Sequence, residues 1–267
     1  MPEMPELEVV QRTLAPRMQG RTIEDVVVSP RLGFLLRTPP QGLPAALRGR
    51  RVVQLWRRGK FLVLDADSAH LVINPMLGGR IQWSAAADKV AAATVFRIRL
   101  TGDDEFRFTD TARMGRVYLA DGDTMGTVPG WAELGPEALD ISAEDFAKRI
   151  RRHPGELKNL LRNQEFIAGI GNAYSDEILH HAQLLPLRRR SSLNAGDIAR
   201  LHASVQHVLA RAVEAISAQP HYETHKQDRS FMAVHMKGGQ DCPRCGHRIS
   251  ELTARGEITN FCRGCQF

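Results

Sequence analysis

Two pairs of cysteines near the end of the chain have the spacing of a metal site. Each pair is C-x-x-C, sixteen residues separate the pairs, and the four residues are Cys242, Cys245, Cys262 and Cys265. A C-x-x-C lets two thiolates face one ion, and the intervening stretch suffices for a hairpin that returns the second pair. Four thiolates suit tetrahedral Zn²⁺ and leave no coordination position open for chemistry. Two disulfides are the alternative, but nothing in the sequence indicates the oxidising compartment that they need. We therefore expect one structural Zn²⁺.

Basic residues exceed acidic ones, and several of them crowd one stretch of the chain. The formal net charge is +6 and the pI is about 9.4, and an excess of this sign indicates a polyanionic partner, most often nucleic acid. The densest stretch comprises Lys148, Arg149, Arg151, Arg152, Lys158 and Arg162, and Arg188, Arg189 and Arg190 follow it. A solvated helix face is the alternative, which a more even alternation with acids would favour.

A glycine-containing turn lies between two stretches of helical spacing. In QEFIAGIGNAYSDEIL, the small residues Ala168, Gly169 and Gly171 precede Asn172. We expect a helix, a tight turn and a second helix that begins near Asn172 or Ala173, with Asn172 as its cap. The backbone N–H groups of such a helix start form a ready phosphate site. An ordinary corner between helices without a ligand is the alternative, but the neighbouring basic residues and cysteines favour DNA.

The elements that must position these residues begin with one helix and a series of strands. Helical spacing of apolar residues extends from Glu6 to about Arg17, and Gly20 ends it. Strands separated by turn residues are expected at 22–29, 50–57, 60–66, 70–77, 80–84, 94–100, 105–110 and 116–121. So many strands after one leading helix indicate a β-sandwich or barrel.

From Ser142 the chain becomes helical. Ser142 followed by Glu144 and Asp145 is a helix N-cap pattern, and further helices follow it. We therefore predict an α+β fold of two domains. The expected divisions are an N-terminal catalytic domain at 1–120, a Gly- and Pro-rich linker at 121–141, a helical domain at 142–228 and a cysteine hairpin at 229–267.

Five features of the chain, taken together, point to a known family. MPEMPELE resembles the M-P-E-L-P-E-V-E start of the formamidopyrimidine-DNA glycosylase and endonuclease VIII family. RRGKFLVL is similar to the family's strand with a catalytic lysine, and LGPEALD to its inter-domain link. LKNLLRNQEFIAGIGNAYSDEIL resembles its helix–two-turn–helix motif, and the four cysteines match its zinc finger in place and spacing. The resemblance spans essentially the whole chain, in the family's order.

The resemblance implies catalytic roles for residues at the amino terminus. Removal of Met1, which a small second residue permits, makes Pro2 the N-terminus, and an α-amino group titrates near ~8, so part of it is uncharged at neutral pH. Glu3 resembles the family's general acid. Glu6 lies one helical turn on and either assists proton transfer or is a first-turn carboxylate favoured by the helix dipole. Lys60 resembles the lysine that contacts phosphate and helps elimination.

The residues expected to wedge into the duplex depart from the family. Many members fill the void left by an everted base with Met, Arg and Phe, and aligning the flanking glycines places Leu77, Ala112 and Met114 at these positions. Leu77 and Met114 remain apolar wedges that can unstack a duplex. Ala112 replaces the Arg that pairs with the orphaned cytosine, so specificity opposite the lesion should be relaxed. Arg113 matches a phosphate-contacting Arg.

The zinc-finger loop departs as well. The family's Arg five residues before the third cysteine is Glu257 here, and the nearest candidate is Arg255. Because a carboxylate repels phosphate, either Arg255 reaches in or the second phosphate is bound or cleaved poorly. The stretch 221–239 is also short for a lid over a purine, so 8-oxoguanine is not the expected base.

The main interpretation is a bifunctional DNA glycosylase/AP lyase that acts on damaged double-stranded DNA. Pro2 would be the nucleophile, with Asn172, Lys158 and Arg113 holding the kinked backbone. An enzyme mainly for abasic sites or a bulky adduct, and a damage-binding protein with little catalysis, are the alternatives. We expect a monomer without an organic cofactor. With no membrane-span run and no leader peptide, we expect a cytoplasmic, nucleoid-associated protein. The preferred base, the base opposite it and the extent of elimination, β or β,δ, stay open.

Overall fold

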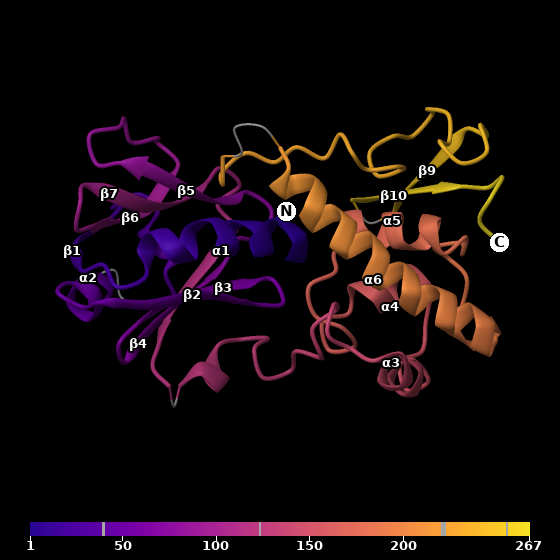
Figure 1. Cartoon of the computed structure of the whole chain (residues 1–267), viewed down its shortest axis with the longest axis horizontal. Helices are drawn as coiled ribbons and strands as arrows, with labels where there is room; N and C mark the ends of the chain where they lie inside the picture. Colours follow the sequence, from indigo (N-terminus) through magenta and orange to yellow (C-terminus); the bar gives the residue numbers. More distant parts are fainter. Residues whose placement is uncertain (39–40, 123, 220–222, 255) are drawn as a thin grey trace. The chain divides into compact units, whose positions relative to one another are not determined.

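The computed structural model describes the chain from Met1 to Phe267 except for residues 39–40, 123, 220–222 and 255. The chain forms two compact units, which Figure 1 follows by sequence colour. The first unit comprises Met1–Ala132 with Ile216–Gln227, and the second comprises Glu133–Ala215 with Asp228–Phe267. In the described part of the chain, no helix is both long and apolar enough to cross a bilayer.

The first unit opens with helix α1 (Met4–Met18), which the apolar spacing predicts. Its buried residues include Leu7, Val10, Leu14 and Met18, which have the helical spacing. Pro5 lies in the first turn, where a backbone N–H would have no partner inside the helix, so its ring costs the helix no hydrogen bond. The helix therefore starts within the first few residues of the chain.

Two antiparallel four-stranded sheets follow α1. One has the order β1 (Ile23–Val28), β6 (Thr94–Leu100), β7 (Asp104–Asp110) and β5 (Gly79–Ala85). The other has the order β2 (Val52–Arg58), β3 (Phe61–Ala66), β4 (Ala69–Asn74) and β8 (Arg116–Ala120). All eight strands overlap the predicted stretches, but β4 ends at Asn74 and not at Leu77, because the chain turns at Met76, whose φ is 49°.

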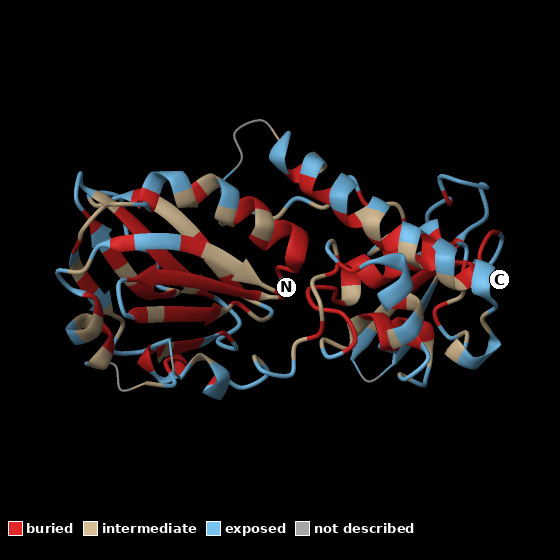
Figure 2. Cartoon of the chain, turned by 60° about the horizontal axis from the view of Figure 1, so that its bottom comes forward, coloured by how far each residue is buried: buried red, intermediate tan, exposed pale blue. Residues whose placement is uncertain are grey.

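One hydrophobic core joins these sheets. Phe96 and Phe106 of the first sheet, Leu62 and Leu71 of the second and Leu14 of α1 belong to the same buried cluster. The strands are accordingly buried over much of their length (Figure 2). The predicted β-sandwich with a leading helix is thus confirmed. The short helices α2 (Gly42–Leu47), η1 (Gly33–Leu35) and η2 (Met125–Thr127) were not predicted.

The second unit is helical and ends in a hairpin, as predicted. Its elements are α3 (Ala143–Ile150), α4 (Leu157–Arg162), α5 (Asn172–His181), η3 (Arg190–Ser192), α6 (Ala195–Ser217, whose last two residues belong to the first unit), and strands β9 (Ile249–Ala254) and β10 (Glu257–Cys262). The Ser142 hydroxyl accepts a hydrogen bond from the backbone N–H of Asp145 at 3.0 Å, so Ser142 is the expected cap of α3.

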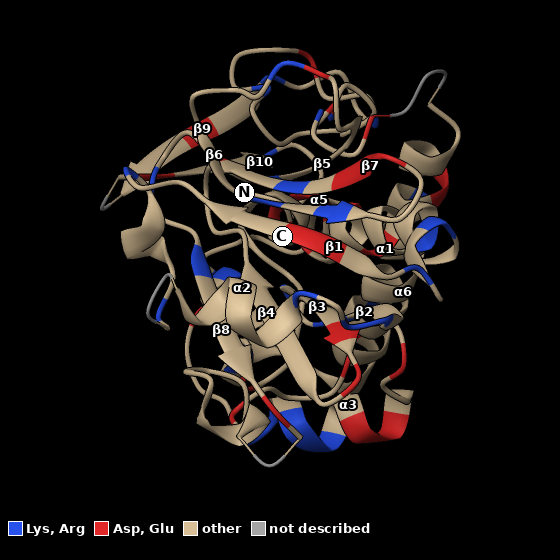
Figure 3. Ribbon diagram, turned by 90° about the vertical axis from the view of Figure 1, so that its left-hand side faces the viewer, with Lys and Arg blue, Asp and Glu red and all other residues tan. Residues whose placement is uncertain are grey.

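Helix α3 contains part of the predicted basic cluster, but acids accompany it. Its first turn holds Glu144 and Asp145 and its last turn Lys148 and Arg149, an arrangement that suits the helix dipole (Figure 3). Lys148 pairs with Glu144 at 2.6 Å, and both side chains are exposed. The alternative of a solvated helix face therefore describes α3 well.

The stretch 121–141, which we expected to be a linker, is divided between the two units at Ala132 and Glu133. On the first side, the Trp131 ring packs against Trp56 at 5.6 Å and Phe61 at 5.5 Å. On the second side, the Gly135 N–H donates to the Gln164 carbonyl at 2.8 Å. The residues on each side of this division are thus anchored by the unit to which they belong.

Candidate active site

The start of α1 fixes two buried carboxylates through a capping box. Glu3 is the N-cap residue, and its backbone N–H donates to Oε2 of Glu6 at 2.9 Å. The Glu3 side chain in turn accepts from the backbone N–H of Glu6. Glu3 is 1% and Glu6 7% exposed, and Pro2 beside them is buried. The helix dipole favours negative charge here, so each carboxylate has both an electrostatic and a hydrogen-bonding reason for its place.

A distant segment reaches the same point. The side-chain N–H of Gln227 donates to Oε1 of Glu6 at 3.0 Å, and the side-chain oxygen of Gln227 accepts from Arg80 at 3.0 Å. A small pocket at this place is lined by Pro2, Glu6, Arg80 and Gln227, among others. Sequence reasoning did not single out Arg80 or Gln227, because nothing in the local pattern of either residue links it to α1.

The turn that carries Lys60 is tied to α1. Lys60 lies between β2 and β3, directly after Gly59, whose φ is 55°. Arg57 donates through Nη1 to the Gly59 carbonyl at 3.1 Å and through Nε to the Glu8 carboxylate of α1 at 2.9 Å. The structure therefore brings the Lys60 turn beside α1, whose N-cap residue is Glu3. We call Pro2, Glu3, Glu6 and Lys60 the amino-terminal site.

One of the two loops expected to wedge into DNA is held by a buried carboxylate, and the other packs against it. Asp110 accepts from four consecutive backbone N–H groups, those of residues 112–115, at 2.6–3.0 Å. A Cβ on Gly78 would lie 2.4 Å from the Ala112 nitrogen, so only glycine allows the two loops to meet. Leu77 is 53% and Met114 44% exposed. The loops thus present both apolar side chains, and Asp110 is a residue that sequence reasoning missed.

The remaining residue of these loops is Arg113. It is exposed, and its φ of 55° lies in the left-handed region, which a residue other than glycine adopts only where its surroundings hold it. The Asp110 carboxylate supplies this support, because it accepts the Arg113 N–H at 3.0 Å.

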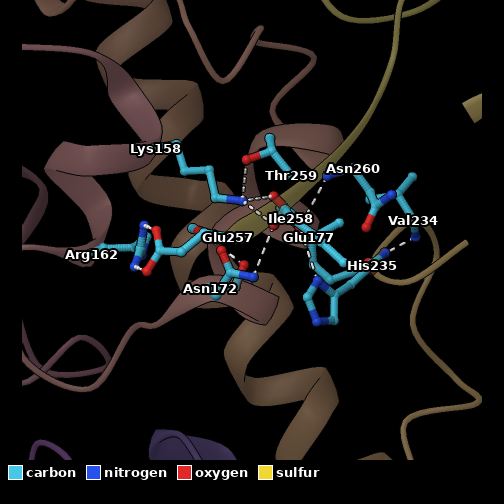
Figure 4. A network of polar contacts seen from close by, with 12 residues as sticks. Lys158, Arg162, Asn172, Glu177, Val234, His235, Glu257, Ile258, Thr259 and Asn260 are labelled. Carbon is cyan, nitrogen blue, oxygen red and sulfur yellow. Dashed lines mark hydrogen bonds and ion pairs between the residues drawn. The ribbon is translucent and has the colours of Figure 1, made fainter. Parts of the chain in front are cut away.

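Lys158, predicted to grip phosphate, is 4% exposed and its ammonium group is fully used inside the second unit. Nζ donates to Asp176 at 2.6 Å, to the Thr259 hydroxyl at 2.8 Å and to the Ile258 carbonyl at 3.1 Å (Figure 4). Burial lowers the pKa of Lys158, whereas the Asp176 charge opposes that shift. An ammonium has three donors, so a phosphate contact would cost one of these bonds.

Asp176 and its neighbour Glu177 join α5 to two other segments. Besides Lys158, Asp176 accepts from His235 Nδ1 at 2.9 Å and from the Asn260 N–H at 3.3 Å. The Glu177 carboxylate accepts from the backbone N–H groups of residues 233–235 at 2.7–2.8 Å (Figure 4). We call Lys158, Asp176, His235, Thr259 and Asn260 the Lys158 network.

Asn172 begins α5 where we expected it, but it is not the cap. The N-cap residue is Gly171, because the chain enters the helix through an extended glycine after Gly169, whose φ is 103°. The Asn172 side-chain N–H donates to the Ile258 carbonyl at 3.0 Å. Its side-chain oxygen Oδ1 is buried without a hydrogen-bond partner among the described residues.

Glu257, the carboxylate in place of the family's arginine, forms an ion pair with Arg162 of α4 (Figure 4). Both guanidinium Nη atoms contact its two oxygens. The Arg162 hydrogen bond lowers the pKa of Glu257, so the pair is charged at neutral pH. Arg162 therefore neutralises the Glu257 carboxylate, which reduces its expected repulsion of phosphate. The other candidate, Arg255, lies outside the described residues.

The four cysteines converge into a possible metal site. Their sulfur atoms all lie within 4.8 Å of one another and none is in a disulfide. Cys242 and Cys265 sulfurs are 3.8 Å apart, and those of Cys245 and Cys262 are 3.5 Å apart. Zn–S bonds of about 2.3 Å give tetrahedral S···S edges of about 3.8 Å, so the donor set fits this ion. His180, whose pKa burial lowers to about 4, contacts the Cys242 sulfur at 3.3 Å.

Comparison with known proteins identifies the family of the chain. The formamidopyrimidine-DNA glycosylase N-terminal domain matches residues 1–117, and the formamidopyrimidine-DNA glycosylase H2TH domain matches residues 134–221. The formamidopyrimidine-DNA glycosylase of Heliobacterium modesticaldum is 36% identical and that of Moorella thermoacetica 34% identical, over 100% and 94% of both chains. A solved complex between the Lactococcus lactis Fpg and an abasic site containing DNA has a TM-score of 0.89 at 25% identity, covering 99% of both chains. A structure of MutM in complex with carbocyclic 8-oxo-G containing DNA gives the same values. The chain belongs to the formamidopyrimidine-DNA glycosylase family.

Proposed function

We propose that this chain is a bifunctional DNA glycosylase/AP lyase of base excision repair. It removes oxidised or otherwise modified bases and then cleaves the strand by β-elimination. Family membership supports the reaction class. The single observation that carries the assignment of roles is the capping box at Glu3 and Glu6, which fixes two buried carboxylates beside Pro2.

Pro2 acts as the nucleophile once Met1 has been removed. Its uncharged secondary amine attacks C1′ of the damaged nucleoside, the N–C1′ bond forms and the bond to the base breaks. Loss of the amine proton and opening of the sugar ring give an iminium ion. This electron sink acidifies the C2′ proton, whose removal expels the 3′ phosphate.

Glu3 and Lys60 support this reaction in different ways. Glu3, oriented by the Glu6 N–H, delivers a proton to the sugar ring oxygen as the ring opens. Lys60, on the turn that Arg57 ties to Glu8, binds the phosphate beside the lesion. Glu6 relays protons in addition to its structural part in the capping box.

Other residues hold the distorted duplex. Leu77 and Met114 wedge between bases, and Arg113 binds phosphate from the loop that Asp110 holds. Asn172 offers phosphate the N–H groups of the α5 start. Lys158 contributes mainly by fixing β10 against α4 and α5, since its donors are occupied. Arg255 stays a proposed phosphate contact.

One structural Zn²⁺ would be held by the four cysteines. It would fix the ends of the β9–β10 hairpin, and the closed set of four thiolates suits no other task. We also propose that the enzyme is a cytoplasmic, nucleoid-associated monomer, with functional parts at 1–120, 142–228 and 229–267 joined by 121–141.

A strand-cleavage assay tests the assignment. Duplexes with a single oxidised pyrimidine, an oxidised purine, its ring-opened form or an abasic site, each opposite all four bases, are incubated with the Met1-processed protein. Cleavage at one or more damaged bases supports the glycosylase. Cleavage at the abasic site alone supports an abasic-site enzyme, the second candidate, which Ala112 favours because its methyl group offers an orphaned base no hydrogen bond. Tight binding without any cleavage would contradict both.

A further inference from the structure

Gln227 lies outside the family motifs and makes a direct contact with the amino-terminal site. It belongs to the first unit although 221 positions separate it from Glu6. Its side-chain nitrogen lies 3.0 Å from Oε1 of Glu6 and 3.5 Å from the Met1 carbonyl oxygen. Its side-chain oxygen lies 3.0 Å from Nη2 of Arg80. One amide therefore joins strand β5 to the first turn of α1.

Arg80 decides which way this amide points. A guanidinium only donates hydrogen bonds, so the Gln227 oxygen must face Arg80 and the NH₂ group must face Glu6. Since the Glu3 N–H already occupies Oε2 of Glu6 at 2.9 Å, the Gln227 contact gives the second oxygen a fixed donor as well. The Glu6 carboxylate is thus held at both oxygens, and its plane cannot rotate without breaking a bond.

The position of the amide relative to Pro2 has a chemical consequence. The Met1 carbonyl carbon is bonded directly to the Pro2 nitrogen, and Gln227 approaches that carbonyl. Pro2, Glu6, Arg80 and Gln227 line the same small pocket. Removal of Met1 frees the Pro2 nitrogen from the Met1 carbonyl carbon. The C1′ atom of the substrate must then bond to this nitrogen at the position that the carbonyl carbon occupied. Glu6 lines the same pocket as Pro2 and is a carboxylate that can accept the proton that the amine must lose.

We propose that Gln227, oriented by Arg80, is a positioning residue that holds Glu6 as the proton acceptor for Pro2, an inference that rests on the proposed function. At an abasic site, the amine adds to the C1′ aldehyde, and its N–H proton passes through Glu6 to the former carbonyl oxygen. The neutral carbinolamine then loses this hydroxyl, protonated by a general acid, as water and leaves the iminium ion. The general acid supplies the proton that leaves in the water, and with this proton counted, atoms and charge balance.

Single-turnover borohydride trapping on an abasic duplex, with protein in excess, tests this assignment. Gln227→Ala should slow adduct formation about 10- to 100-fold, because a misplaced proton acceptor costs rate rather than binding. Affinity for a duplex with a stable abasic analogue should change less than about twofold. Glu223→Gln, a half-exposed position on the same segment, is the matched control and should match wild type.

The pH profile separates positioning from a structural effect. Gln227→Glu places a second carboxylate against Glu6, which raises the apparent pKa of the pair, so the acidic limb of the trapping rate should move to higher pH. Arg80→Ala should slow trapping less than Gln227→Ala does, because the amide stays but loses its fixed orientation.

The results distinguish failure of the role of Gln227 from failure of the proposed function. Wild-type rate and pH profile in both Gln227 variants would overturn the inference while leaving the proposed function intact, as would equal losses of rate and affinity. No adduct with the wild-type protein would overturn the proposed function itself, and the inference with it.

Discussion

The amino-terminal site and the Lys158 network are both buried arrangements of charged side chains, yet they use their charges in opposite ways. In the first, Glu3 and Glu6 are oriented by backbone N–H groups and an amide, which are neutral donors. In the second, the Lys158 ammonium lies against the fully buried Asp176 and spends its remaining donors on Thr259 and Ile258. A neutral partner orients a charge without cancelling it, whereas an opposite charge cancels it.

This difference distinguishes the amino-terminal site, whose side chains are positioned to react, from the Lys158 network, whose side chains stabilise the fold. The backbone N–H groups and the Gln227 amide orient the oxygens of Glu3 and Glu6, which positions both side chains for proton transfer. A lysine paired with a buried carboxylate has already exchanged its hydration for protein contacts, and phosphate would have to compete with Asp176 for it. The comparison predicts large structural effects from the Lys158 network and chemical effects from the amino-terminal site.

The largest effect should follow loss of the metal site. Cys262→Ser removes a ligand at the end of β10, the strand that also contains Thr259 and Asn260. Because structural zinc contributes folding free energy directly, we expect the hairpin to lose its order and affinity for abasic DNA to fall at least about 100-fold. Zinc content by atomic absorption and binding by fluorescence anisotropy measure this. Near-wild-type binding by a zinc-free variant would contradict it.

Breaking the buried pair tests the comparison directly. Asp176→Asn leaves the Lys158 ammonium buried without its counter-charge, so the free energy of unfolding should fall by about 3–5 kcal/mol in chemical denaturation. Glu144→Gln is the control, since its pair with Lys148 is exposed and should be worth at most about 1 kcal/mol. Adding Lys158→Met to Asp176→Asn should recover part of the loss. Equal small losses in both single variants would show that the pair is not structural.

Asp110 extends the comparison to the wedge loops, where one buried carboxylate orients four neutral N–H groups. Asp110→Asn removes one accepting oxygen, which should lower the free energy of unfolding by about 1–3 kcal/mol. The rate of base eversion, followed with 2-aminopurine beside an abasic site, should fall as well. Asp67→Asn is the control, because Asp67 is exposed and accepts one backbone N–H at 3.3 Å. An unchanged rate of base eversion would show that Asp110 does not support the wedge residues.

The smallest effect should come from Glu257, whose half-exposed carboxylate neutralises Arg162. Glu257→Gln should tighten DNA binding several-fold, because Arg162 becomes available to bind one phosphate. The slope of log binding constant against log salt concentration should then become steeper by about 0.9. The Arg162 hydrogen bond lowers the Glu257 pKa, so the ion pair persists above the ordinary glutamate pKa and is lost only as pH falls through the lowered value. The difference between variant and wild type should therefore be constant from about pH 6 to 8. A titration of the difference in that range would contradict the assignment.

The sequence predicts local structure well because local structure depends on near neighbours. The eight strands, the Ser142 cap and the start of α5 all follow from spacing and turn residues. The Asn172 cap was wrong because Gly171 can adopt the extended entry into α5 and so takes the capping position, leaving the Asn172 amide to bond Ile258. Helix α2 was missed because six residues that include Pro44 show no helical period.

Side-chain pairing over long distances is what the sequence does not reveal. The motif around Lys158 predicts a basic group near DNA, but its acceptors lie 18 and about 100 positions away. Gln227 and Asp110 carry no motif, and their importance appears only when the fold brings Glu6 and the 112–115 backbone to them. Residue type and spacing therefore located the candidate site, while the fold decided which charges stay available in it.

Borohydride trapping with and without Met1 tests the central claim most directly. The Met1-processed protein and a form that retains Met1 are each incubated with a labelled duplex bearing an abasic site, reduced and resolved on a denaturing gel. If the Pro2 amine is the nucleophile, the processed protein should give a covalent adduct, and the Met1-retaining form should give at least about 100-fold less. Equal adducts from both forms, or tight salt-sensitive binding with no adduct from either, would contradict the account.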